Sequence, residues 1–96
     1  MNSKDRAYLR GLANTVEPIF QVGKLGINDN LIKQVDDALE ARELIKLTVL
    51  ETAPSDARDI AIELANNTNS IVVQVMGRKI TLYRKRVKDS KININV

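Results

Sequence analysis

The amino-acid sequence predicts an α/β domain of the two-layer type, in which helices and strands alternate in the order α-β-α-β-α-β-β. Segments with apolar residues at helical spacing alternate along the chain with short runs rich in Val, Ile and Leu. The last two of these runs are separated only by a turn around Gly77 and Arg78, which is typical of a hairpin. The length of 96 residues, with 44% hydrophobic and 28% charged residues, fits one folded domain with a modest core.

The N-terminal third is expected to hold one helix and one strand. A first helix is predicted over about residues 4–14, with Ser3 as its N-cap and with apolar side chains on one side. Residues 18–22 predict a short strand that begins at Pro18, where a missing N–H donor is tolerated. A loop over residues 23–28 follows.

The middle of the chain predicts two helices around one strand. A helix is expected after Asn28 and up to about Arg42, and its buried side is predicted to hold Leu31, Val35, Ala38 and Leu39. Residues 45–50 alternate like a strand, which Pro54 ends. Ser55 is predicted to cap a third helix that ends near residues 66–67.

Two further strands are predicted over residues 71–75 and 79–83. Right-handed crossovers make the first three strands parallel and place the second and third helices on one face of the sheet. The hairpin sets the fourth strand antiparallel. The loops 23–28 and 51–55 and the Gly77 turn then lie at one edge, where ligands of open α/β sheets usually bind. Residues 1–86 are predicted to form the domain, and residues 87–96 a basic, flexible tail.

The residue types that are absent limit the chemistry. The chain has no cysteine and no histidine, which excludes disulfides, thiolate nucleophiles and the commonest general base and zinc ligand. Acidic residues cluster at Asp36, Asp37 and Glu40 and again at 56–63, but only some of them share a helix face, so we interpret them as solvated. We therefore expect no enzyme activity, no metal site and no cofactor.

Charge is distributed unevenly along a chain with a net charge of +3. Residues 27–70 hold four basic and nine acidic side chains, whereas residues 71–96 hold seven basic and one acidic. A surface polarised in this way is typical of nucleic-acid binders, although solvated, solubilising charges would give the same counts. Aromatic residues are too few for a base-stacking platform, so backbone and shape contacts would dominate RNA binding.

The sharpest local motif is the segment Gly23, Lys24, Leu25, Gly26 between the first strand and the second helix. Two glycines there let a phosphate approach free backbone N–H groups at the start of a helix, and Lys24 adds a charge. A turn that merely needs glycine explains the same pattern, and the pattern alone favours that interpretation. The nucleotide P-loop is excluded because Leu25 stands where Ser or Thr is required. The predicted topology brings further basic side chains toward this loop: Lys33, Arg58, Arg78 and Lys79.

Three segments in order, 22–26, 41–46 and 77–84, resemble the bacterial YhbY family, a single CRM (chloroplast RNA splicing and ribosome maturation) domain. The resemblance covers about residues 3–86. It implies a four-stranded mixed sheet of order 1-2-4-3, similar to the C-terminal domain of translation initiation factor three. It also implies RNA binding through the glycine loop, with Gly23, Lys24 and Gly26 matching the loop and Tyr83 and Arg84 a closing motif. Arg42 stands where the family often has histidine, which keeps a cation there.

These observations predict an RNA-binding protein. The resemblance to the YhbY family implies that it associates with ribosomal RNA or precursors of the large ribosomal subunit and assists ribosome assembly. The predicted RNA-binding residues are Gly23, Lys24, Leu25, Gly26, Lys33, Arg58, Arg78, Lys79 and Arg84. A protein-interaction module, a DNA binder and a metal-dependent nuclease stay open as alternatives. The N-terminus has no apolar segment typical of export, so we expect a cytoplasmic protein without a membrane partner, taken as a monomer.

Overall fold

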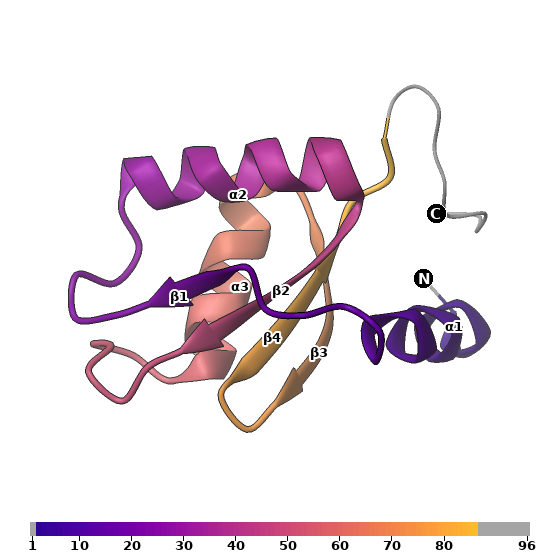
Figure 1. Ribbon diagram of the computed structural model, residues 1–96, viewed down its shortest axis with the longest axis horizontal. Coiled ribbons are helices and arrows are strands. Elements are labelled where there is room, and N and C mark those ends of the chain that lie inside the picture. The colour runs from indigo at the N-terminus through magenta and orange to yellow at the C-terminus, as the bar shows by residue number, and fades with distance from the viewer. Residues whose placement is uncertain (1, 87–96) are drawn as a thin grey trace.

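The protein is described here by a computed structural model that covers residues 2–86, and Figure 1 shows its arrangement. Within these residues three helices and four strands follow one another in the predicted order. They are α1 (Ser3–Ala13), β1 (Phe20–Val22), α2 (Asp29–Arg42), β2 (Leu44–Val49), α3 (Ala57–Thr68), β3 (Ile71–Met76) and β4 (Lys79–Tyr83). The predicted tail at 87–96 lies outside the described residues.

Each helix begins at a polar side chain that accepts a hydrogen bond from a backbone N–H three residues later. Asn2 accepts from Asp5 at 2.8 Å, Asn28 from Leu31 at 2.8 Å, and Asp56 from Asp59 at 2.9 Å. α2 therefore begins directly after Asn28, as predicted. The predicted caps at Ser3 and Ser55 were wrong by one residue, because the neighbouring Asn2 and Asp56 have the extended backbone from which a side chain reaches the first turn.

The sheet has the order β1-β2-β4-β3 that the family resemblance implied. β1 is parallel to β2, whereas β4 is antiparallel to both of its neighbours, β2 and β3. β1 is shorter than predicted and starts at Phe20, although the Ile19 N–H already donates to the Lys46 carbonyl at 2.9 Å. β1 and β3 are the two edge strands.

The main core lies between one face of the sheet and the helices α2 and α3. Ile45, Leu47 and Val49 of β2 point into it, together with Ile80 and Leu82 of β4. The helices supply Val35, Leu39, Ile60, Ala61 and Leu64. The prediction that both crossover helices cover one face is confirmed, and Figure 1 shows α2 and α3 on the same side of the strands.

α1 packs against the opposite face of the sheet, at the end where β2 begins. Leu9 and Ala13 contact a second apolar cluster that contains Leu44, Val73 and Tyr83. The Arg6 guanidinium donates to the carbonyls of Val72 and Val73, both at 2.8 Å, beside an irregularity in the β3 register. α1 thus closes one end of the domain and leaves the other end to the connecting loops (Figure 1).

Candidate functional site

Three connections converge at the end of the sheet remote from α1, as predicted. A Cβ at Gly26, in the β1–α2 loop, would lie 2.9 Å from Pro54 of the β2–α3 loop. The Arg78 carbonyl in the β3–β4 hairpin accepts from the Val49 N–H at 2.7 Å, and the Arg78 guanidinium pairs with Glu51 at 2.9 Å. The loops are therefore in mutual contact and form one continuous edge.

The Gly23–Gly26 loop is a tight turn, which the Gly26 N–H closes by donating to the Gly23 carbonyl at 2.9 Å. Gly26 has a φ of 64° and fits closely against the Pro54 ring, so the fold itself requires glycine there. The need for a glycine in this turn is therefore enough to explain Gly26, without a role in binding phosphate.

Gly23 differs from Gly26. Its φ is not in the left-handed region, and an added Cβ would meet its nearest neighbours, Leu50 and Thr52, only at an ordinary 3.8 Å. The fold alone does not require glycine at this position. Without a Cβ, the backbone at Gly23 carries no side chain of its own, and the vacant position borders Leu50 and Thr52.

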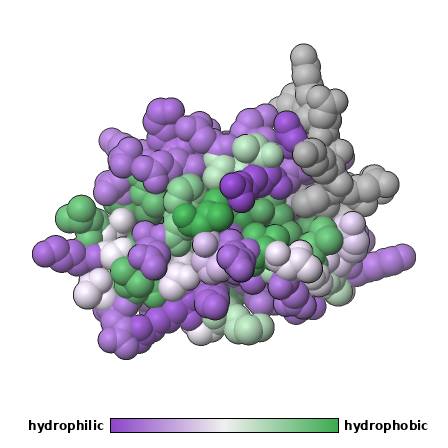
Figure 2. Space-filling model, in the orientation of Figure 1, coloured by the Kyte–Doolittle hydropathy of each residue, from purple (hydrophilic) through white to green (hydrophobic). Residues whose placement is uncertain are grey.

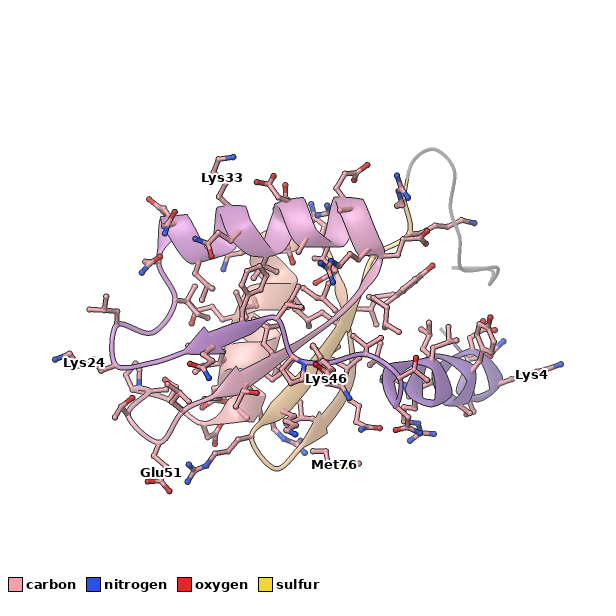
Figure 3. The ribbon with its side chains drawn as sticks, viewed as in Figure 1. Lys4, Lys24, Lys33, Lys46, Glu51 and Met76 are labelled. Carbon is pink, nitrogen blue, oxygen red and sulfur yellow. The ribbon has the colours of Figure 1, made fainter. Side chains whose placement is uncertain are left out.

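Lys24 and Leu25 occupy the tip of this loop and are exposed, Leu25 to 79%. In Figure 3 the Lys24 side chain extends from the loop into solvent. α2 begins three residues after Gly26, and the positive end of its dipole adds to the charge of Lys24. An open cleft of about 410 Å³ lies between the loop and this helix start, lined by Gly23–Gly26 together with Gln21, Asn28, Asn30, Leu31 and Gln34.

The basic residues predicted for the site divide into two groups. Lys24, Arg58, Arg78 and Lys79 all lie at the loop end, on the glycine loop, the first turn of α3 and the β3–β4 hairpin. Lys79 is exposed and points away from α2 and α3, because its neighbour Ile80 points into the core between them. Arg78 pairs with Glu51. The sequence analysis missed this acid, although it lies two residues after β2, in the loop at this edge.

Lys33 and Arg84 do not join the loop. Lys33 lies on the outer side of α2 (Figure 3), where it pairs with Asp37 at 3.4 Å. Arg84 follows β4 and so lies at the opposite end of the sheet. Its guanidinium donates to the carbonyl of Thr68 at 2.8 Å and to the carbonyl of Asp36 at 3.0 Å. It also pairs with the carboxylates of Asp36 and Glu40, so its contacts tie β4 to α2 and to the end of α3.

No cluster of three or more potential metal ligands occurs within residues 2–86. The same part of the chain contains no helix that combines the length and the apolar character of a membrane span.

Comparison with known proteins settles the family. Residues 1–84 match the CRS1/YhbY (CRM) domain. The chain belongs to this family. It is 44% identical over 94 residues to "Probable RNA-binding protein YqeI" of Bacillus subtilis, with 98% of each chain covered. It is 27% identical over 94 residues to a protein of Haemophilus influenzae named "RNA-binding protein", with 98% of this chain and 94% of that protein covered.

A solved structure confirms the fold. The solution structure of SAV1595 from Staphylococcus aureus, described as a candidate RNA-binding protein, superposes with a TM-score of 0.82 at 45% identity. The superposition covers 99% of both chains. The family and these relatives are described as RNA-binding proteins and not as enzymes.

Proposed function

We propose that this protein binds RNA through the edge formed by the three loops, with the Gly23–Gly26 loop and the start of α2 holding a backbone phosphate. The observation that carries the proposal is Gly23: a glycine that the fold does not need stands beside the exposed Lys24, in the loop that leads to the start of α2. Membership in a family whose relatives are named RNA-binding proteins supports the same ligand.

Lys24, Arg58, Arg78 and Lys79 supply the positive charge in this proposal. Lys24 and Lys79 make no ion pair within residues 2–86 and are available to phosphate at once. Arg78 must exchange Glu51 for phosphate, which costs little because both side chains are more than half exposed. Phosphate contacts of this kind release counterions and give affinity that depends strongly on salt.

We further propose that the RNA is ribosomal RNA within precursors of the large ribosomal subunit, that the protein acts in the cytoplasm, and that it assists ribosome assembly as a monomer. The resemblance to the YhbY family supports this choice. Sedimenting a cell lysate through a gradient tests it: we expect the protein to co-migrate with large-subunit particles. A protein found only at the top of the gradient would contradict the ribosomal role while leaving RNA binding itself intact.

The RNA-binding proposal is tested by measuring affinity against salt for the wild-type protein. With roughly four to six phosphate contacts on flexible RNA, log affinity should fall against log salt with a slope of about −3 to −4. A slope near zero would favour a protein-interaction module. Equal affinity for duplex DNA would favour a DNA binder, and Mg²⁺-stimulated cleavage of the RNA would favour a nuclease.

A matched pair of lysine variants locates the site. Lys24→Ala should weaken RNA binding and reduce the magnitude of the salt slope by about 0.7, while the melting temperature stays unchanged. Lys4→Ala is the control, because Lys4 is also an exposed lysine but lies on α1 at the other end of the molecule (Figure 3). Equal effects of the two variants would contradict the placement at the loop edge.

A further inference from the structure

A groove runs from the glycine loop along the side of α2 that faces β1. Beside the cleft of about 410 Å³ at the loop lie two further hollows, of about 430 and 480 Å³. Gln34 borders all three, so they adjoin one another at this side chain. We define the α2–β1 groove by six residues: Ile19, Phe20, Leu31, Gln34, Ala38 and Arg42.

The groove exists because the apolar stripe of α2 is wider than the sheet beneath it. Val35 and Leu39 are fully buried, whereas Leu31 and Ala38 are only partly covered, since β1 is a three-residue edge strand. Figure 2 shows the result as hydrophobic surface between the hydrophilic outer side of α2 and the strands below it. Ile19 and Phe20, also half-buried, form the opposite wall.

Polar groups are placed at defined points along this groove, and its middle hollow also borders Gln21 and Thr48. The Gln34 side chain is exposed at the middle and has no partner within residues 2–86. Arg42, in the last turn of α2, is exposed at the far end and likewise makes no ion pair in the described chain. Among residues 2–86, the single acidic residue that borders the groove is Asp37, which pairs with Lys33 at 3.4 Å. From Asn30 to Arg42 the helix spans roughly 18 Å.

We propose that the α2–β1 groove holds the unpaired bases of a short single-stranded RNA segment. The inference rests on the proposed function, because the segment continues from the phosphate held at the Gly23–Gly26 loop. The Gln34 carboxamide, with one acceptor and two donors, bonds to the edge of a base over the apolar groove wall. Arg42 pairs with a phosphate at the end of the segment, so cations hold the strand at both ends.

The features of the groove favour this occupant over the two obvious alternatives. Bases in an RNA duplex are stacked and paired inside the helix, and they cannot enter a channel on the protein surface. A peptide that extended the sheet at β1 would find only three strand residues to pair with, fewer than a strand of ordinary length offers. The cations at both ends of the groove also match the phosphates of a nucleic acid.

The experiment compares affinities for a random-sequence single-stranded RNA oligonucleotide and for the same sequence annealed to its complement. Wild-type protein should prefer the single strand. Gln34→Glu should weaken single-strand binding roughly tenfold, because it places a carboxylate in the groove at nearly constant volume and helix propensity. Arg42→Ala should weaken it roughly threefold to tenfold and reduce the magnitude of the salt slope by about 0.7.

Two control variants make the same change of charge on a helix outside the groove. Asn66→Asp adds the same charge as Gln34→Glu to an exposed position of α3 outside the groove. Arg10→Ala removes an exposed arginine from the last turn of α1, as Arg42→Ala does from α2. Both controls should bind single-stranded RNA within twofold of wild type. Titration of ¹⁵N-labelled protein with the oligonucleotide should shift the Gln34 side-chain amide and the backbone amides of residues 31–42.

The outcomes separate the groove from the loop. If Lys24→Ala weakens binding but Gln34→Glu and Arg42→Ala act like their controls, the groove inference is overturned and the proposed function stands. Equal wild-type affinity for the duplex overturns it as well, as does a titration in which only the loop amides shift. If the wild-type protein binds neither the single-stranded RNA nor the duplex, the proposed function itself is contradicted, and the groove inference falls with it.

Discussion

Replacing Gly26 with alanine should destabilise the protein, whereas the same change at Gly23 should not. At Gly26 the new Cβ meets two adverse conditions: a φ of 64° and the Pro54 ring, whose Cγ and Cδ would lie at 2.9 and 3.3 Å. The left-handed backbone costs about 1 kcal/mol, and overpacking against a proline ring that cannot rotate away costs about 1–2 kcal/mol more. The free energy of unfolding should therefore fall by about 2–3 kcal/mol, and the melting temperature by roughly 10–20 °C.

At Gly23 the added methyl group meets nothing closer than 3.8 Å. Because alanine also restricts the unfolded chain, Gly23→Ala should leave the free energy of unfolding unchanged or raise it by about 0.5 kcal/mol. For RNA affinity, the order of the two variants should be reversed, with Gly23→Ala affected more than Gly26→Ala. Measured well below the melting temperature of either variant, Gly23→Ala should weaken binding, since its methyl group stands where a phosphate is proposed to approach the backbone.

Urea unfolding followed by circular dichroism measures the stability of both variants, and filter binding to the single-stranded oligonucleotide measures affinity. Equal stabilities of Gly26→Ala and Gly23→Ala would refute the steric reasoning. Wild-type affinity in the stable Gly23→Ala variant would refute the role of Gly23 in binding, and with it the main argument for the phosphate site.

Three further variants test the framework of the domain. Arg84→Ala should lower the free energy of unfolding by about 2–3 kcal/mol, because it removes charged hydrogen bonds to two carbonyls from a side chain that is only 19% exposed. If urea titration gives the variant a free energy of unfolding within about 0.5 kcal/mol of the wild-type value, the structural role of Arg84 is contradicted. Arg78→Ala breaks only an exposed pair and should cost less than about 1 kcal/mol in the same assay. Tyr83→Phe should be neutral or stabilising by up to about 1 kcal/mol at neutral pH, because the buried Tyr83 hydroxyl has no hydrogen-bond partner within residues 2–86. Burial, and then the nearby acids Glu43 and Asp5, raise the pKa of Tyr83 above its usual 10.0. The wild-type protein should therefore lose stability as the pH rises above about 10, and Tyr83→Phe should lose less. A parallel loss of stability in both proteins would contradict the assignment of this pH dependence to Tyr83.

The order of elements was predictable because each carries its own local signal. Three local signals indicate whether each segment is a helix, a strand or a hairpin: apolar residues at helical spacing, alternation of β-branched residues, and the Gly77 turn. The right-handedness of the crossovers then places the three loops at one edge of the sheet. The two wrong caps show the limit of such signals. Ser3 and Ser55 each stand beside another residue with the same capping tendency, and only the backbone angles decide between neighbours.

Long-range pairing was the part that the sequence does not reveal. Arg84 belongs to a matching motif, yet its partner Asp36 lies 48 residues earlier, so its place at the far end of the sheet requires the fold. The α2–β1 groove was hidden for a related reason. The pattern marks Leu31 and Ala38 as buried with the rest of the stripe, and only the shortness of β1 leaves them partly uncovered. The pairing of Arg78 with Glu51, by contrast, follows from the topology once the charges at the edge are counted.

The contact between Arg6 and β3 bears on how copies of this protein behave at high concentration. An edge strand normally offers a row of unpaired carbonyls to any other extended chain, which invites aggregation. Here one guanidinium takes the carbonyls of Val72 and Val73, next to a register shift that already interrupts the regular spacing of the strand. The helix that carries Arg6 packs on the neighbouring sheet face and holds it in place. One side chain from α1 thus occupies two carbonyls of β3, which should make this edge a poorer template for pairing with another extended chain.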